Sequence, residues 1–322
     1  DNMTTFNTVI KKRNPTNDGW DSILPITTAE NVLINEEGDS VATHLAKKAT
    51  DEALGHVKSD GVTTTIDANG VIKCKRKETT SAITYYVRTN GNDSNDGSAD
   101  DAAHAFKTIK KATSLLEGLT AKHTITINIK TGTYAEGIDL KNIISFSTIS
   151  LVADGGDVTL TGESSTGSVA AISISNLICN CVYFDKGSGA FKIKPVSAFG
   201  TSFYGLYSFA DCMIYAKLKI DCDTWPVGIT NKYGISVSDK TKVVLKSGTI
   251  ISNCYGGALC ATGLGEITTG SGTGTGNNIG YIVYSGGKIF ISATSGNGHI
   301  AGTTQKERHT GGLIVDPNGL IT

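Results

Sequence analysis

The sequence predicts an all-β fold in which many short strands wind into a stacked coil, with three strands in each turn. The 322 residues include 38 glycines and only five prolines, and Thr, Ser, Ile and Val outnumber Leu and Met. This composition is typical of short strands joined by tight turns. From Thr124 to about Ile291 apolar and polar residues alternate with period two, without helical patterns. A run of about 170 such residues exceeds a typical sandwich, so we expect a coil rather than a sandwich or a barrel.

The expected strands of the coil are separated by glycine-containing turns. They include Thr124–Ile129, Ile149–Val152, Val158–Leu160, Ile172–Ile174, Lys217–Ile220, Val243–Leu245 and Lys288–Ile291. Because alternation gives each strand one apolar face, stacked turns would enclose a continuous core.

Three short segments precede the coil. Residues 1–39 are polar with a few short clusters of apolar residues, so we interpret them as an attachment segment that needs a partner surface. Residues 40–58 contain a narrow apolar stripe at helical spacing, which fits either a short trimeric neck or a lone surface helix. Residues 59–82 form an expected β-hairpin connector around Asn69-Gly70. The sequence Val315–Ile321 is similar to Ile66–Ile72 and predicts a hairpin at 301–322, or the start of a further module.

The expected coil spans residues 83–300, and residues 83–120 begin it. A strand at Ile83–Arg88 leads into the acidic loop Asn90–Gly97 and then into a helix at Ala105–Glu117. That helix places Phe106, Ile109, Ala112 and Leu116 on one face, and we expect it to cover the open end of the coil. The glycine of the loop is out of register for an EF-hand, so Asx-turns explain the loop better than bound calcium.

Charge and cysteine content argue against several classes of protein. The net charge is -1 with a pI near 6.6, so we expect no nucleic-acid partner. No signal-peptide pattern occurs in residues 1–30, and the uncharged run Ser247–Gly265 contains too many glycines for a membrane span. The seven cysteines lack framework or zinc-site spacing, so we expect free thiols that pack as small apolar groups, and no metal or cofactor.

Short segments of the sequence carry two resemblances to known families. Tyr85–Ser98, Ala105–Ala112 and Thr131–Glu136 resemble the start of right-handed parallel β-helices in phage tail spikes and the pectate-lyase-like superfamily. Trp20–Leu33 is similar to N-terminal segments of tail-fibre and baseplate proteins from phages of Gram-positive bacteria. The resemblance implies a homotrimeric fibre or spike of a phage tail or phage-tail-like particle. Residues 1–39 would attach it to other tail proteins, and it would be assembled in the bacterial cytoplasm.

Many β-helix spikes cleave the glycan that they bind, so enzymatic activity is a separate question. The lyases of the superfamily resemble one another in their motifs, as do the hydrolases, and both sets of motifs are absent here. No arginine that could act as a base lies between Arg88 and Arg308. A glycosidase would still need two carboxylates, and the candidates are Asp211, Asp221, Asp223 and Glu266. We select Asp221 and Asp223, which would share one strand face. The alternative is that these carboxylates are solvated turn residues.

Aromatic residues are the candidates for glycan binding, because the C–H face of a sugar packs on an aromatic ring. They are dense between residues 199 and 233, where a projecting loop is possible, and we select Trp225, Tyr204, Tyr207, Tyr215 and Tyr233. Trp225 precedes a proline and is expected outside the coil. The alternative is that the rings stack inside. We therefore expect a receptor-binding protein that contacts a bacterial surface glycan, with a polysaccharide depolymerase and a passive structural shaft as alternatives.

Overall fold

The computed structural model describes residues 10–13, 16, 20–23, 64–66, 71–74, 76–165, 169–197, 200–291 and 300–316. The chain divides into two compact units, Asp1–Lys75 and Arg76–Thr322. The helix expected in residues 40–58 and most of the segment 1–39 lie outside the described residues.

In the first unit the described residues include two short antiparallel strand pairs. Strand β1 (Ile10–Arg13) pairs with β2 (Trp20–Ile23), in a segment for which the sequence predicted no regular structure. Strand β3 (Thr64–Ile66) pairs with β4 (Ile72–Cys74), and Ile66 lies opposite Ile72. This is the pairing that a turn at Asn69-Gly70 predicts, although the turn residues 67–70 lie outside the described part.

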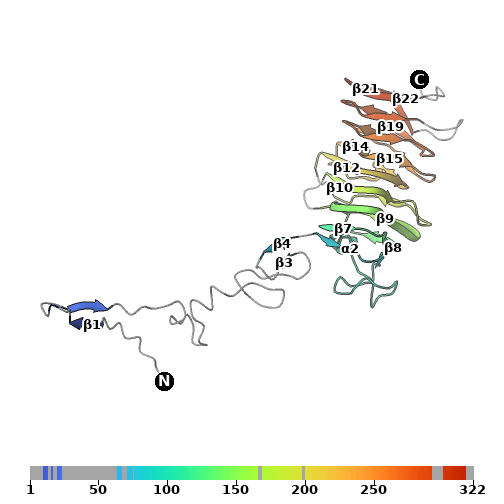
Figure 1. Ribbon diagram of the computed structural model, residues 1–322. Helices are drawn as coiled ribbons and strands as arrows, with labels where there is room; N and C mark the ends of the chain where they lie inside the picture. The colour runs from blue at the N-terminus through green and yellow to red at the C-terminus, as the bar shows by residue number, and fades with distance from the viewer. Residues whose placement is uncertain are drawn as a thin grey trace. The chain divides into compact units, whose positions relative to one another are not determined.

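The second unit is a coil of parallel strands that wind around one axis (Figure 1). Its first elements are β5 (Lys77–Glu78), β6 (Ile83–Val87) and the helix α2 (Ile109–Ser114). The strands that follow are β7 (Leu119–Ala121), β8 (Ile125–Tyr134), β9 (Ile138–Leu160), β10 (Ala170–Tyr183), β11 (Phe191–Ile193), β12 (Ser202–Ala216), β13 (Leu218–Asp221), β14 (Asn231–Asp239), β15 (Lys242–Leu245), β16 (Ile250–Ser252), β17 (Gly257–Ala261), β18 (Glu266–Thr268), β19 (Gly274–Val283), β20 (Lys288–Phe290), β21 (Ile300–Arg308) and β22 (Leu313–Val315), with a 3-10 turn, η1 (Cys222–Thr224), after β13.

The register shows how the chain winds, because each strand segment pairs with the segment one turn later. Ile138 lies beside Ile172, Ile172 beside Leu206, and Leu206 beside Ile235. The described strands of this unit form three parallel sheets. The first sheet includes 138–145, 172–179, 204–212, 233–239 and 257–261; the second includes 149–154, 181–183, 213–216, 242–245 and 266–268; the third includes 158–160, 191–193, 218–221 and 250–252. The expectation of stacked parallel turns is therefore confirmed.

The core is a set of apolar columns inside the coil. Ile138, Ile172, Leu206, Ile235 and Leu259 follow one another in the first sheet and are all fully buried. Burial of each such side chain stabilises the fold by about 1.5–3 kcal/mol. Cys179, Cys212, Cys222, Cys254 and Cys260 are buried free thiols, as predicted.

Helix α2 is shorter than predicted, but its buried face is the predicted one. Phe106, Ile109, Ala112 and Leu116 are all buried, and α2 contacts β6, β8 and β9. The helix starts only at Ile109 because Phe106 is still extended and forms a β-bridge with Val87. Two carboxylates then bind the first N–H groups of the helix. Asp93 accepts from the N–H of Thr108 at 2.8 Å, and Glu136 accepts from the N–H of Ile109 and of Lys110 at 2.8 and 2.9 Å.

The loop before α2 consists of Asx-turns, as predicted. Asn92 Oδ1 accepts the N–H of Ser94, and Asp96 Oδ1 accepts the N–H of Ser98, each at 2.9 Å. The described residues contain no group of three or more His, Cys, Asp and Glu side chains placed to hold a metal ion.

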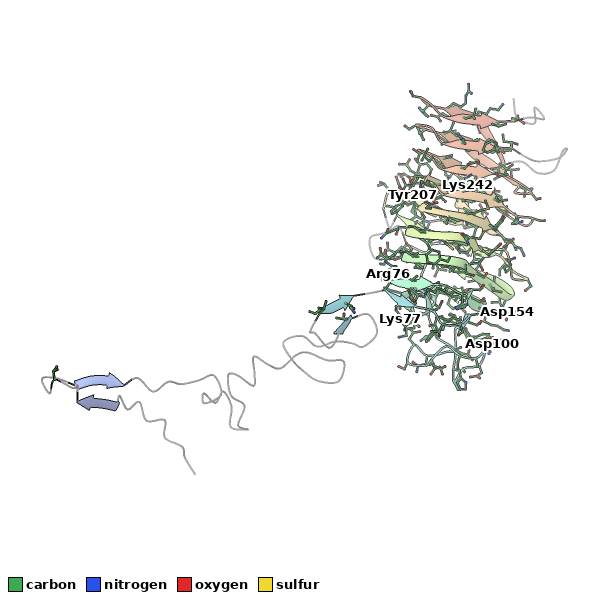
Figure 2. The ribbon with its side chains drawn as sticks, viewed as in Figure 1. Arg76, Lys77, Asp100, Asp154, Tyr207 and Lys242 are labelled. Carbon is green, nitrogen blue, oxygen red and sulfur yellow. The ribbon has the colours of Figure 1, made fainter. Side chains whose placement is uncertain are left out.

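Parallel pairing extends past both expected ends of the coil. At the start, Arg76 is followed at once by β5, which begins at Lys77 and pairs with β7 (both residues are labelled in Figure 2). At the other end, β21 and β22 pair in parallel with β19 and β20, so residues 300–315 continue the coil instead of forming a separate hairpin. The turn expected at Asn318-Gly319 lies outside the described residues. No helix in the described part of the chain is long and apolar enough to cross a membrane.

Candidate functional site

Four aromatic rings form a continuous row on the outer surface of the first sheet, and we call them the aromatic strip: Tyr204, Tyr207, Phe209 and Tyr233. Tyr204 and Tyr233 stack with ring centroids 4.6 Å apart and planes 13° apart. Tyr204 contacts Tyr207 at 5.1 Å, and Tyr207 contacts Phe209 at 5.6 Å. None of these rings is buried in the core, since the tyrosines are partly exposed and Phe209 is exposed.

The position of one glycine brings Tyr204 and Tyr207 to the same face. In a regular strand, residues three apart point to opposite faces. Here Gly205 and Leu206 both face the interior, so the alternation shifts by one residue between the two tyrosines. A Cβ atom at Gly205 would lie 2.5 Å from Ile220 Cδ1 and 2.8 Å from the carbonyl oxygen of Gly234, so a larger residue does not fit there.

Two tyrosines of the strip, Tyr204 and Tyr233, have a raised pKa and stay protonated at neutral pH. Burial, together with the charge of neighbouring tyrosines, raises the pKa of Tyr204 to about 12. Burial also raises the pKa of Tyr233. Each hydroxyl can therefore both donate and accept hydrogen bonds, as a ligand rich in hydroxyl groups requires.

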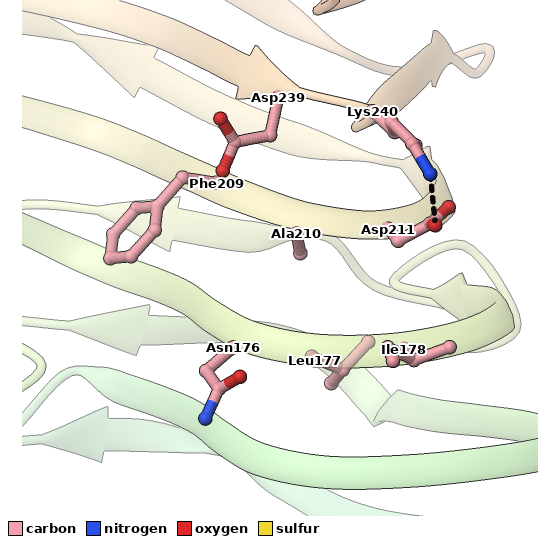
Figure 3. A pocket seen from close by; sticks show the side chains of 8 residues that line it. All are labelled: Asn176, Leu177, Ile178, Phe209, Ala210, Asp211, Asp239 and Lys240. Atoms are coloured by element: carbon pink, nitrogen blue, oxygen red, sulfur yellow. Dashed lines mark hydrogen bonds and ion pairs between the residues drawn. The ribbon is translucent and has the colours of Figure 1, made fainter.

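A groove of about 250 Å³ adjoins the strip at Phe209, where the strands of the first sheet bend (Figure 3). We call it the corner groove; it is lined by Asn176, Leu177, Ile178, Phe209, Ala210, Asp211, Asp239 and Lys240. Lys240 Nζ lies 3.3 Å from Asp211 Oδ2. The groove thus combines one aromatic ring with two carboxylates, an amide and an ammonium group.

The bend that forms the groove depends on residues with positive φ. Asn142, Asn176 and Asp239 have φ angles of 57°, 45° and 55°, which Asn and Asp tolerate better than most residues. Asn176 Nδ2 donates to Asn142 Oδ1 at 2.5 Å, which links the bends of successive turns. Sequence reasoning missed Asn176, Asp239 and Lys240, although the αL-tolerant residues Asn176 and Asp239 at the ends of alternating runs were a usable signal.

The two carboxylates selected for catalysis, Asp221 and Asp223, do not share a strand face. Asp221 ends β13 and caps the turn η1, in which Asp223 lies. Asp221 accepts from Asn253 Nδ2 at 2.8 Å, and Asp223 accepts from the hydroxyl of Tyr255 at 3.0 Å. Both carboxylates therefore have structural partners in the segment after β16, which agrees with the alternative that they are turn residues.

Trp225 is buried, so its expected exposure is wrong. Only 3% of its surface is exposed, its ring meets Phe203 edge to face at 5.6 Å, and Nε1 donates to the carbonyl oxygen of Ile193 at 3.2 Å. The possible projecting loop is not found, because most of the described residues of that segment form β12, β13 and β14. Tyr215 lies on the second sheet, stacked on Tyr183, and does not belong to the aromatic strip.

Comparison of the chain with protein-family models, with curated proteins and with solved structures finds no match.

Proposed function

We propose that this protein is a glycan-binding fibre or spike of a phage tail or phage-tail-like particle. The observation that carries the proposal is the aromatic strip beside the corner groove. A row of partly exposed rings offers packing surface to the C–H faces of successive sugar units. The polar groups of the groove are suited to bind the hydroxyl groups of a sugar that lies against Phe209.

The coil suits this role because it is a rigid support for a long ligand. Parallel strands repeat every 4.7–4.9 Å along the axis, so side chains in successive turns form rows that an extended polymer can follow. Tyr204 and Tyr233 are aligned in neighbouring strands and form part of such a row.

The remaining parts of the proposal rest on the resemblance of the sequence. We infer a right-handed coil whose open end is covered by α2, a homotrimer, and attachment to other tail proteins through residues 1–39. The proposed location is the virion tail, with no membrane insertion and no bound nucleic acid. Analytical ultracentrifugation of the full chain tests the trimer, and a monomer at micromolar concentration would count against it.

Binding of the full chain to host cells tests the glycan proposal. We expect Tyr207→Ala and Tyr233→Ala each to weaken binding by about tenfold, equivalent to about 1.4 kcal/mol. Tyr255→Ala is the matched control, because Tyr255 is 53% exposed and lies outside the strip. Equal binding by the wild type and both strip variants would refute the proposed site. A folded protein that binds neither cells nor isolated wall glycans would favour the passive shaft.

A depolymerase is the second candidate, favoured by the presence of Asp211 and Asp239 in one groove. Glycoside hydrolysis uses two carboxylates on either side of the scissile bond. Incubation with host wall polysaccharide should then release new reducing ends, and Asp211→Asn or Asp239→Asn should abolish the release. Asp221→Asn provides the comparison at the originally selected site. Absence of new ends with a polysaccharide that the protein demonstrably binds would exclude this candidate.

A further inference from the structure

A second pair of aromatic rings lies on the second sheet, away from the aromatic strip. Tyr183 and Tyr215 occupy aligned positions in neighbouring strands. Their ring centroids are 5.0 Å apart and their planes differ by 8°. Both rings are partly exposed.

Each ring of this pair has a lysine ammonium group over it. Lys186 Nζ lies 4.0 Å from the centroid of Tyr183, and Lys246 Nζ lies 4.7 Å from the centroid of Tyr215. A third lysine, Lys217, reaches the same region and donates to the carbonyl oxygens of Gly187 and Ser188 at 3.4 and 3.1 Å. We call these five residues the basic tyrosine pair: Tyr183, Tyr215, Lys186, Lys217 and Lys246.

The three lysines of this region have no carboxylate partner among the residues that the structure describes, unlike several other lysines of the coil. Lys130, Lys219 and Lys242 each have a carboxylate partner at 2.7–3.1 Å. Within the described residues, no carboxylate lies within ion-pair distance of Lys186, Lys217 or Lys246. The opposing group is Asp185, whose charge acts on Tyr183. Three positive charges against one negative charge leave a net positive field.

We propose that the basic tyrosine pair is a second binding site, for an acidic sugar that carries a carboxylate or a phosphate. The ring faces are covered by each other and by the two lysines, so the sugar would lie against the exposed ring edges. The ammonium groups, held in place by the rings, would pair with its anionic group. The site differs from the aromatic strip, whose groove carries Asp211 and Asp239 and so disfavours an anion. The inference shares with the proposed function only the assumption that the ligands are glycans.

Titration of the full chain with three polymers tests the inference: polygalacturonate, poly(glycerol phosphate) and neutral dextran. We expect binding of at least one acidic polymer at low salt, weakened as the salt concentration rises. Lys186→Gln with Lys246→Gln should lower that affinity by about tenfold, since two charge contacts are lost. Asp185→Asn should raise the affinity, because it removes the opposing charge. Comparison of the two acidic polymers separates a uronate ligand from a phosphodiester ligand.

Two controls separate this site from the aromatic strip. Lys242→Gln with Lys288→Gln makes the same change of charge elsewhere on the second sheet and should leave the affinity unchanged. Tyr207→Ala should also leave binding of the acidic polymer unchanged, while it weakens binding to host cells. The inference is wrong if neither acidic polymer binds at low salt, or if the lysine variants bind like the wild type. Those results would leave the cell-binding test of the aromatic strip unaffected.

Discussion

Lys232 is a charged side chain that is buried in the coil and binds backbone carbonyl oxygens there. It is aligned with the buried Phe203 and is itself only 7% exposed. Its ammonium group donates to the carbonyl oxygens of Cys222 at 2.8 Å and Trp225 at 3.2 Å, and lies 5.6 Å from the ring centroid of Tyr255. These bonds fix the turn η1 and hold Trp225 inside the coil.

Replacement of Lys232 by methionine should therefore destabilise the fold. Met fills a similar volume but leaves the carbonyl oxygen of Trp225 without this donor, at a cost of about 1–3 kcal/mol for a buried group. The carbonyl oxygen of Cys222 keeps the N–H of Trp225, at 3.1 Å. The measurement is the free energy of unfolding in urea. Lys242→Met is the matched control, because Lys242 pairs with Glu266 at the surface, where such a pair contributes about 1 kcal/mol or less. Equal stability of Lys232→Met and the wild type would contradict the role given to Lys232.

Glu136 makes the stability of the fold depend on pH, and the direction of its pKa shift fixes the sign of that dependence. Burial raises the pKa of this carboxyl group, against the opposing effect of the Lys110 and Ile109 N–H groups. A pKa raised in the folded state means that the folded chain binds more protons between the unfolded and the folded pKa. The contribution of Glu136 to stability therefore falls as the pH rises through that range above 4.5.

Urea unfolding of the wild type and Glu136→Gln at pH 4, 5, 6 and 7 tests this sign. Because glutamine does not titrate there, the difference in stability between the two proteins isolates Glu136. The difference should move in favour of the wild type as the pH falls. A shift in favour of Glu136→Gln on acidification would show that the two N–H bonds outweigh burial.

At the scale of the element, strand β10 shows how strictly the coil separates its inner and outer faces. Ile174 is fully buried, whereas Ile178, four residues later, is 56% exposed. In a regular strand both would face the same side, but the positive φ of Asn176 shifts the alternation between them. Because of that shift, Ile178 lines the corner groove instead of the core.

The same substitution at these two positions should have very different effects. Ile174→Ala removes core side-chain volume and should lower the free energy of unfolding by about 2–5 kcal/mol. Ile178→Ala changes a surface residue and should stay within about 0.5 kcal/mol of the wild type. Thermal or urea unfolding of the two variants measures the contrast. Similar losses at both positions would contradict the assignment of the two faces.

The elements also show which features the sequence can predict. Period-two alternation is a local property, so the strands of the coil and the buried face of α2 were predictable. The membership of the aromatic strip depends on the inward position of Gly205 and on the register between β12 and β14, which no local pattern reveals. Trp225 was misplaced for a related reason. Pro226 does lie outside the strands, but the ring of Trp225 turns inward to Phe203 and Ile193.

At the scale of the whole second unit, every proposed site depends on the stacking of the coil. The aromatic strip and the basic tyrosine pair lie on different sheets because β12 passes from the first sheet to the second after Cys212. Both sites therefore need the same parallel register, turn after turn. With an antiparallel arrangement of these strands, neither row of rings would form.

A distance between two labels tests this register most directly. Thr148 and Leu313 belong to one row of the second sheet, linked by aligned pairs through Cys181, Met213, Lys242, Glu266 and Lys288. Six strand spacings of 4.7–4.9 Å predict a backbone separation of about 29 Å. Genetically encoded spin labels at these two positions leave the native cysteines untouched. In labelled chains assembled with a large excess of unlabelled chain, so that a trimer carries at most one labelled copy, double electron–electron resonance should give a single narrow peak near that distance. A peak displaced by more than about 10 Å from six strand spacings, or a broad distribution, would contradict the stacked coil.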